Sequence, residues 1–289
     1  MVPAAVLILA GPGRAEHERA LDGLDALAAH EPALLRETLI VDDDAARPRE
    51  AWPASVAVLE NPRRGRGIGT LGGTVAGTLA GLGWLHRHAP GAWVLRLDAD
   101  ALVIGPVADR VQEAWRAGDG VLGSCSRTCT GERRDVSGWS AEVRRHERSV
   151  WAWAHPPRRP GWVRPADPFV RGVLAEARRA GYAPGEHCVA AGCAVSAPLV
   201  SALSARGWLD RPDRWLAARL GDDIVLGAMS RACGLELRDL PSVFGIRHVG
   251  LPAAPAGLMA RGFGVVHSTK NDPDHDEASV RAFFAAERA

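Results

Sequence analysis

The first hundred residues alternate between short apolar runs and longer amphipathic runs. The apolar runs have the length and composition of buried strands, and the amphipathic runs carry apolar residues at helical spacing. Strands are predicted at 4–10, 37–41 and 55–59 and in the run that leads into Asp98 and Asp100, with helices at 16–29 and 70–87. Because strands joined through helices run parallel, this alternation predicts an α/β fold with a largely parallel sheet.

The rest of the chain continues this pattern. Helices are predicted at 107–117, 169–180, 198–206, after 222 and at 272–289, and strands at 120–124, 187–195, 236–240 and 264–270. The chain has 289 residues, 47% of them hydrophobic, which is enough to bury a full core. Since no flexible linker interrupts it, we expect a single large domain, a Rossmann-like mixed and mostly parallel sheet flanked by helices.

Polar residues follow each of the first four predicted strands. These clusters are Gly11 with Arg14, Asp42 to Asp44, Arg63 to Arg66, and Asp98 with Asp100. In open α/β sheets, ligands bind beyond the carboxyl ends of the strands. The four clusters are therefore expected to meet at one edge of the sheet.

Asp98 and Asp100 flank one alanine, so an extended chain turns both carboxylates to the same side. Their mutual repulsion is relieved by a divalent cation, although Asp-x-Asp also occurs as a plain acidic turn. The last predicted strand delivers His267 and Lys270, the only lysine. Two carboxylates and an imidazole suit Mn²⁺ or Mg²⁺, and a neighbouring lysine suits a diphosphate.

Asp222 and Asp223 precede a predicted helix. Aspartate at a helix N-terminus is an ordinary cap, and Asp222 is the better cap candidate. Two caps in succession are not needed, so Asp223 is the preferred candidate for a chemical role.

Composition excludes several classes of protein. The net charge of +1 argues against a general nucleic-acid binder. The apolar run 1–9 is too short for a signal peptide or a membrane span, so we expect a cytoplasmic protein with no transmembrane segment. Five cysteines are an odd number and predict reduced thiols. Cys125 and Cys129 have a zinc-like spacing, but without a second such pair a structural zinc is not expected.

Two further segments are open to more than one interpretation. Residues 67–72 match G-x-G-x-x-G, but they follow a basic loop rather than a strand end, which favours close helix packing over a dinucleotide site. Residues 127–167 form an insertion rich in Arg, Pro and Trp, with a possible helix at 140–153. Its tryptophans, Trp139, Trp151, Trp153 and Trp162, either stack on a sugar or pack the insertion onto the body.

The order of these motifs resembles that of the GT-A type glycosyltransferases, which use nucleotide-diphosphate sugars. The residues that carry the resemblance are Leu7-Ile8-Leu9-Ala10-Gly11, Asp42, Asn61-Pro62-Arg63-Arg64-Gly65, Leu97-Asp98-Ala99-Asp100 at the place of the DXD motif, Gly221-Asp222-Asp223-Ile224-Val225-Leu226-Gly227 and Val266-His267-Ser268-Thr269-Lys270. The resemblance covers most of the chain, but the insertion at 127–167 matches no acceptor-site pattern.

The resemblance implies a role for each matching residue. The nucleotide sugar would be bound by Gly11, Arg14, Asp42 or Asp43, Arg63, Arg66, Asp98 and Lys270. The Mn²⁺ or Mg²⁺ ion would be bound by Asp98, Asp100 and His267. The catalytic base of an inverting enzyme would be Asp223 or Asp222. Asp98 belongs to both the nucleotide-sugar set and the metal set, because it would contact the ribose, the metal or a water bound to the metal. Residues 1–120 would form the donor half of the domain and 121–289 the acceptor and catalytic half.

The implied protein is a bacterial-type, hexosyltransferase-like enzyme. Its donor would be UDP- or GDP-linked, its acceptor an unknown hydroxyl on a small molecule or glycan, and a homodimer is possible. One alternative is a nucleotidyltransferase that makes sugar nucleotides, but the lysine usual after its first Gly-rich loop is missing after Gly13-Arg14. The other is a non-catalytic nucleotide-binding module.

Overall fold

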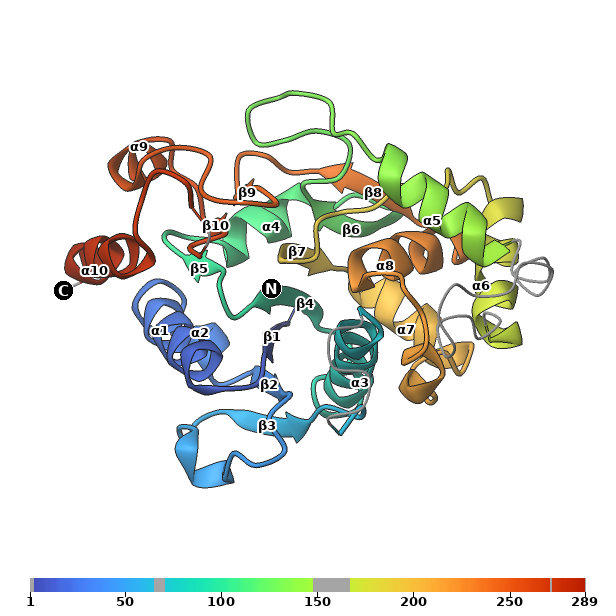
Figure 1. The fold of residues 1–289 in the computed structure, drawn as a ribbon, viewed down its shortest axis with the longest axis horizontal. Helices are drawn as coiled ribbons and strands as arrows, with labels where there is room; N and C mark the ends of the chain where they lie inside the picture. Colours follow the sequence, from blue (N-terminus) through green and yellow to red (C-terminus); the bar gives the residue numbers. More distant parts are fainter. Residues whose placement is uncertain (1–2, 65–70, 148–166, 271, 289) are drawn as a thin grey trace, which may run out of the picture.

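The computed structural model describes residues 3–64, 71–147, 167–270 and 272–288. These form a seven-stranded sheet in the order β3-β2-β1-β4-β7-β6-β8, with helices on both faces (Figure 1). The strands are β1 (Ala4–Ala10), β2 (Thr38–Asp42), β3 (Ala57–Glu60), β4 (Trp93–Asp98), β6 (Asp119–Gly123), β7 (Gly192–Val195) and β8 (Glu236–Asp239). Only β7 runs antiparallel to its neighbours β4 and β6. The predicted mixed, mostly parallel sheet is confirmed.

Side-chain alternation along the strands builds a separate core on each face of the sheet. Leu7 and Val94 face the helices α3 (Gly72–His88), α6 (Pro168–Arg179), α7 (Ala197–Ala205) and α8 (Asp222–Ala232). Ile8 and Leu95 face α1 (Arg14–His30), α2 (Pro32–Leu35) and α4 (Ala108–Ala114). Because both faces are covered, the central strands read as continuous apolar runs rather than alternating ones.

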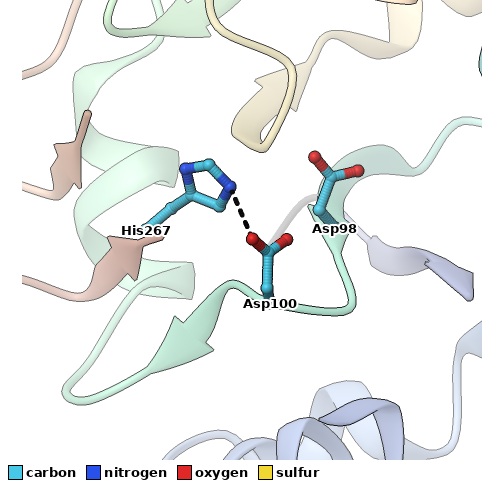
Figure 2. Close-up of side chains that lie close together, drawn as sticks. All are labelled: Asp98, Asp100 and His267. Atoms are coloured by element: carbon cyan, nitrogen blue, oxygen red, sulfur yellow. Dashed lines mark ion pairs between the residues drawn. The ribbon is translucent and has the colours of Figure 1, made fainter. Parts of the chain in front are cut away.

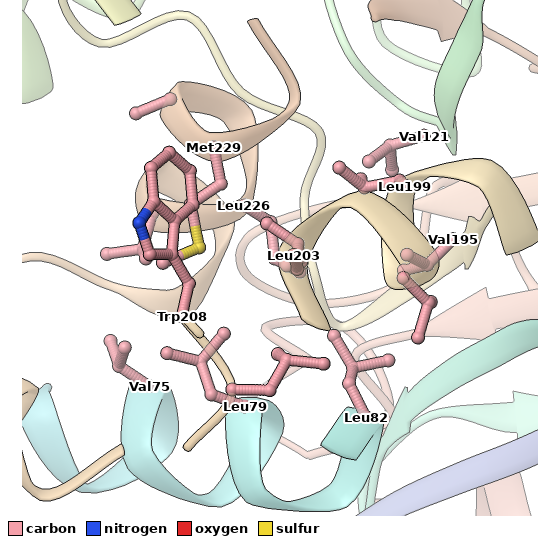
Figure 3. Close-up of a cluster of buried hydrophobic side chains, with 14 of the residues drawn as sticks. Val75, Leu79, Leu82, Val121, Val195, Leu199, Leu203, Trp208, Leu226 and Met229 are labelled. Carbon is pink, nitrogen blue, oxygen red and sulfur yellow. The ribbon is translucent and has the colours of Figure 1, made fainter. Parts of the chain in front are cut away.

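The core under α3 shows how the two halves of the chain pack together. Val75, Leu79 and Leu82 on α3 point toward Leu203 of α7 and Trp208 beyond it (Figure 3). Leu79 is 1% exposed and Leu82 is fully buried. Burial of these side chains joins the first strands to α7 and α8 and stabilises one continuous body.

Leu79→Ala is expected to lower the free energy of unfolding by about 2–5 kcal/mol, because it removes buried methyl groups and leaves a cavity. Chemical denaturation followed by circular dichroism measures the change. Leu71→Ala is the matched control, since Leu71 is 40% exposed and its truncation should cost less than about 0.5 kcal/mol. Equal losses in the two variants would contradict this description of the core.

A second, three-stranded sheet places the C-terminal part of the chain beside β4. It has the order β5-β10-β9, from β5 (Leu102–Val103), β9 (Phe244–Ile246) and β10 (Val265–His267). β5 follows β4 after a short turn and pairs antiparallel with β10. Helices α9 (Pro255–Ala260) and α10 (Glu277–Arg288) pack against this sheet. β10 therefore ends next to the β4–β5 turn.

One expectation about local structure is wrong. The strand predicted at 187–195 is confined to Gly192–Val195, because the backbone before it pairs with the loop after β6: the Val189 N–H donates to Ser124 O. Within the insertion, the expected helix is present as α5 (Ser137–Glu147), and its predicted continuation to 153 lies outside the described residues. Among the described helices, none combines the length and the apolar character needed to cross a membrane.

The expectation of fully reduced cysteines is also wrong. Cys125 and Cys188 form a disulfide across 63 residues of sequence. The reason is topological: Cys125 follows β6 and Cys188 precedes β7, and these two strands are neighbours in the sheet. Cys129, at the zinc-like spacing, is a free thiol that packs against the core of the second sheet instead.

Candidate functional site

Three potential metal ligands meet where the two sheets adjoin. Asp98 ends β4, Asp100 lies in the turn that leads to β5, and His267 ends β10. One ligand atom from each lies within 4.8 Å of the others (Figure 2). Side chains that are 169 residues apart in sequence, Asp98 and His267, thus face one small volume. The predicted convergence of the Asp-x-Asp pair with the last strand is present.

The tautomer of His267 suits a cation. Its Nδ1 lies 2.8 Å from the carbonyl oxygen of Arg247, so Nδ1 carries the proton and donates it. Nε2 then faces Asp100 Oδ2 at 3.2 Å. Two acceptors this close are stable only with a proton or a cation between them. A divalent ion such as Mn²⁺ or Mg²⁺ fits this donor set of two carboxylates and one imidazole.

Positive charge surrounds Asp100. The Ser268 hydroxyl donates to Asp100 Oδ2 over 2.6 Å, and Lys270 Nζ lies 3.6 Å from the same oxygen. Burial would raise the pKa of Asp100, but the hydrogen bond and charge of His267, the charge of Lys270 and the hydrogen bond from Ser268 outweigh it and hold the pKa well below its usual range. Burial lowers the pKa of His267, yet the Asp100 carboxylate raises it above the ordinary value. Asp100 is thus an ionised, pre-oriented ligand.

Lys270 also contacts a residue that sequence reasoning missed. Its Nζ lies 3.2 Å from Glu16 Oε1, on the first turns of α1. Burial lowers the pKa of Lys270, but the carboxylates of Asp100 and Glu16 together raise it, so the ammonium is charged. A Cβ on Gly11 would come within 2.9 Å of Glu16 Cγ, so Gly11 leaves room for this glutamate. The β1–α1 loop therefore adjoins the candidate metal ligands.

Arg96 is the second residue that sequence reasoning missed. It lies in the middle of β4, is 1% exposed, and joins Asp98 (2.6 Å) to Asp222 (2.7 Å). Asp222 also accepts from the Thr78 hydroxyl on α3. The signal in the sequence was a single arginine inside the apolar run 93–97, a position where an unpaired charge is costly.

The expected cap role of Asp222 is wrong. The N-cap of α8 is Gly221, and Asp222 is the first helical residue, with its carboxylate drawn to Arg96 and Thr78 instead. Only Asp223 bonds the helix terminus, by accepting from the Ile224 N–H.

Asp223 is mostly buried and lies beside His187. Its Oδ2 is 3.5 Å from His187 Nε2, and the Trp139 ring lies 6.4 Å from the imidazole. Burial and the charge of Asp222 raise the pKa of Asp223 to about 7, against the opposing charges of Arg134 and Arg96. Burial and the Arg134 charge lower the pKa of His187 to about 4, so this histidine is neutral at pH 7.

The acidic end of β2 is occupied by internal contacts. Asp42 is buried and accepts from Arg47 and from the Trp52 indole N–H, the latter over 2.8 Å. Asp43 forms a two-point ion pair with Arg63. Since Asp42 is 5% exposed and both of its oxygens already accept hydrogen bonds, little of its carboxylate is open to a ligand.

Two arginines of the expected site, Arg14 and Arg66, have not yet been placed. Arg14 is 90% exposed and pairs with Glu18 on the next turn of α1. Arg66 and most of the glycine-rich segment 67–72 lie outside the described residues, as do Trp151, Trp153 and Trp162. The structure therefore brings together Asp98, Asp100, His267 and Lys270, and keeps Arg14 at the surface.

No protein-family model and no curated protein matches the sequence. Solved structures match at low identity. The chain aligns with the WbbM bifunctional glycosyltransferase at 12% identity and TM-score 0.48, over 100% of this chain but 50% of that one. It aligns with the galactosyltransferase LgtC, solved with donor and acceptor sugar analogs, at 12% identity and TM-score 0.46, over 98% and 95% of the two chains. Core-mannan synthase A from Aspergillus fumigatus, in an Mn/GDP form, gives 10% identity and TM-score 0.43 over 83% and 73%.

These matched structures are glycosyltransferases, the class that the sequence resembles. This chain spans half the length of the first of them. The TM-scores of these three alignments are all below 0.5.

Proposed function

We propose that this protein is a GT-A type glycosyltransferase that uses Mn²⁺ or Mg²⁺ and a UDP- or GDP-linked sugar, and transfers the sugar to a hydroxyl acceptor. The observation that carries the proposal is the meeting of Asp98, Asp100 and His267 within 4.8 Å. A pre-oriented imidazole and an ionised, buried carboxylate form a site of the kind that holds a divalent cation.

The residues of this cluster divide between holding the cation and binding the diphosphate in the proposed reaction. Asp98, Asp100 and His267 would hold the cation, which supplies positive charge to the diphosphate as it leaves the sugar. Lys270, 3.6 Å from Asp100, adds a charged donor for a phosphate oxygen. Glu16, 3.2 Å from the ammonium, fixes the direction of the lysine side chain.

Asp223 is the proposed general base of an inverting transfer. A base must accept the proton of the acceptor hydroxyl as its oxygen attacks the anomeric carbon, and it works best with a pKa near the working pH. Burial and Asp222 raise the pKa of Asp223 to about 7, which meets this requirement. Asp222 is the weaker candidate because its carboxylate is engaged by Arg96 and Thr78.

The division of labour along the chain is part of the proposal. Residues 1–120 would bind the donor, with the Asp43–Arg63 pair near the base or ribose, and residues 121–289 would bind the acceptor. Trp139, close to His187 and hence to Asp223, is the described tryptophan of the insertion that would contact a sugar acceptor. A cytoplasmic location and a homodimer stay predictions from the sequence.

The reaction class can be tested by the product that is released. With UDP- and GDP-sugars and Mn²⁺, the proposal expects release of the nucleoside diphosphate, by transfer or by slow donor hydrolysis. A nucleotidyltransferase would instead release pyrophosphate from a nucleoside triphosphate and a sugar phosphate. Release of pyrophosphate, or binding of nucleotide with no turnover of any donor, would contradict the proposal.

A further inference from the structure

A guanidinium lies where the sheet should be apolar. Arg96 pairs in register with Leu7 on β1 and Cys193 on β7, both fully buried. Its own strand neighbours Leu95 and Leu97 belong to the core on the opposite face. Burying a charge in such surroundings is costly unless several partners compensate it. The contacts of Arg96 should therefore reveal what it does.

The contacts of Arg96 connect the metal ligands to the α8 terminus. Nη1 lies 2.6 Å from both Asp98 Oδ1 and the carbonyl oxygen of Ala190, and Nη2 lies 2.7 Å from Asp222 Oδ2. Ala190 stands in the segment just before β7, so the guanidinium is anchored to backbone as well as to the two carboxylates. One rigid planar fork thus fixes the separation of Asp98 and Asp222.

The position of Asp98 requires such an anchor. Its side chain is 34% exposed, whereas Asp100 is 4% exposed and is held by Ser268 and His267. Asp98 is thus the least enclosed of the three candidate ligands. Groups that hydrogen-bond a metal ligand orient it and strengthen metal binding, and their removal typically weakens affinity about 10- to 100-fold.

We infer that Arg96 is a positioning residue that holds Asp98 in its metal-binding orientation and ties it to Asp222, so that the cation site and the start of α8 keep one fixed geometry. This inference rests on the proposed function. Arg96 binds neither metal nor substrate; it acts through Asp98 and Asp222. A lysine cannot replace it, because one ammonium cannot bond both carboxylates and the Ala190 carbonyl in this fork.

The test is Mn²⁺ affinity, measured by electron paramagnetic resonance on the full chain without nucleotide. Arg96→Gln and Arg96→Lys should each raise the Mn²⁺ dissociation constant about 10- to 100-fold. Arg96→Lys is included because it keeps the positive charge beside Asp98 and Asp222 and is therefore expected to fold. Circular dichroism checks that both variants are folded. Arg238→Gln is the control: Arg238 pairs with Asp119, at the start of β6 and hence at the opposite edge of the sheet. Its Mn²⁺ affinity should stay within about twofold of wild type.

A double-mutant cycle separates positioning from general stability. If Arg96 acts through Asp98, Asp98→Asn with Arg96→Gln should bind Mn²⁺ no more weakly than Asp98→Asn alone. Additive losses, or an unchanged affinity in both folded Arg96 variants, would overturn the inference and leave the proposed function standing. A wild-type protein that binds neither Mn²⁺ nor Mg²⁺ would instead overturn the metal site, and the inference with it.

Discussion

Asp100→Asn is expected to reduce Mn²⁺-dependent sugar transfer about 10³-fold. Asp100 is the buried carboxylate that faces His267 at 3.2 Å, and its replacement removes the charge that would bind the cation. Metal stabilisation of a departing phosphate contributes several kcal/mol, which corresponds to a rate factor of about this size. Initial rates with a fixed donor and varied Mn²⁺ measure the effect.

The same variant gives a second readout that does not need the acceptor. Mn²⁺ with UDP or GDP should raise the melting temperature of the wild type, because a ligand that binds only the folded state stabilises it, and Asp100→Asn should lose this shift. Asp119→Asn is the matched control, a buried carboxylate paired with Arg238 far from the candidate ligands. Wild-type activity in Asp100→Asn would rule out its assignment as a metal ligand.

Asp223→Asn is expected to lower kcat about 10²- to 10⁴-fold and to leave binding of the nucleotide and Mn²⁺ unchanged. The amide keeps the shape of the side chain but cannot accept a proton. Calorimetric titration of the nucleotide and steady-state kinetics together separate binding from turnover. Weakened nucleotide binding with a normal kcat would place Asp223 in the donor site and exclude it as the base.

The pH dependence of the wild type provides an independent check on this role. Because burial and Asp222 raise the pKa of Asp223 to about 7, against Arg134 and Arg96, its base form is lost as the pH falls through 7. His187, at 3.5 Å, has a pKa near 4 and stays neutral across this range. The kcat–pH profile should therefore decline below about pH 7. Asp223→Asn should show a flat residual rate over the same range.

The fold was readable from the sequence because its elements are local and periodic. The run 4–10 and the helical spacing around 16–29 predict β1 and α1 closely. The parallel pairing of β1 with β2 and of β1 with β4 is consistent with the helices α1 and α3 that lie between successive strands. By contrast, β5 has two residues and β9 has three, and both pair with β10, which is distant in sequence. No local sequence pattern therefore predicts these two strands.

The sequence predicts the candidate metal ligands, but it does not predict the residues that hold them in place. Asp98 and Asp100 stand at a strand end, where carboxylates gather in α/β folds. The Arg96–Asp222 pair joins residues 126 positions apart, and only the folded chain brings the start of α8 to β4. The same holds for the Cys125–Cys188 disulfide, which depends on β6 and β7 being neighbours. Contacts set by topology need the folded chain.

We propose that Asp98, Asp100 and His267 hold the cation that binds a nucleoside diphosphate. Anomalous diffraction from crystals soaked with MnCl₂ and UDP or GDP tests it most directly. We expect one manganese peak within coordination distance of Asp100 Oδ2 and His267 Nε2, with the diphosphate beside Lys270. A nucleotide bound elsewhere, or a diphosphate at Lys270 with no manganese among these three side chains, would contradict it.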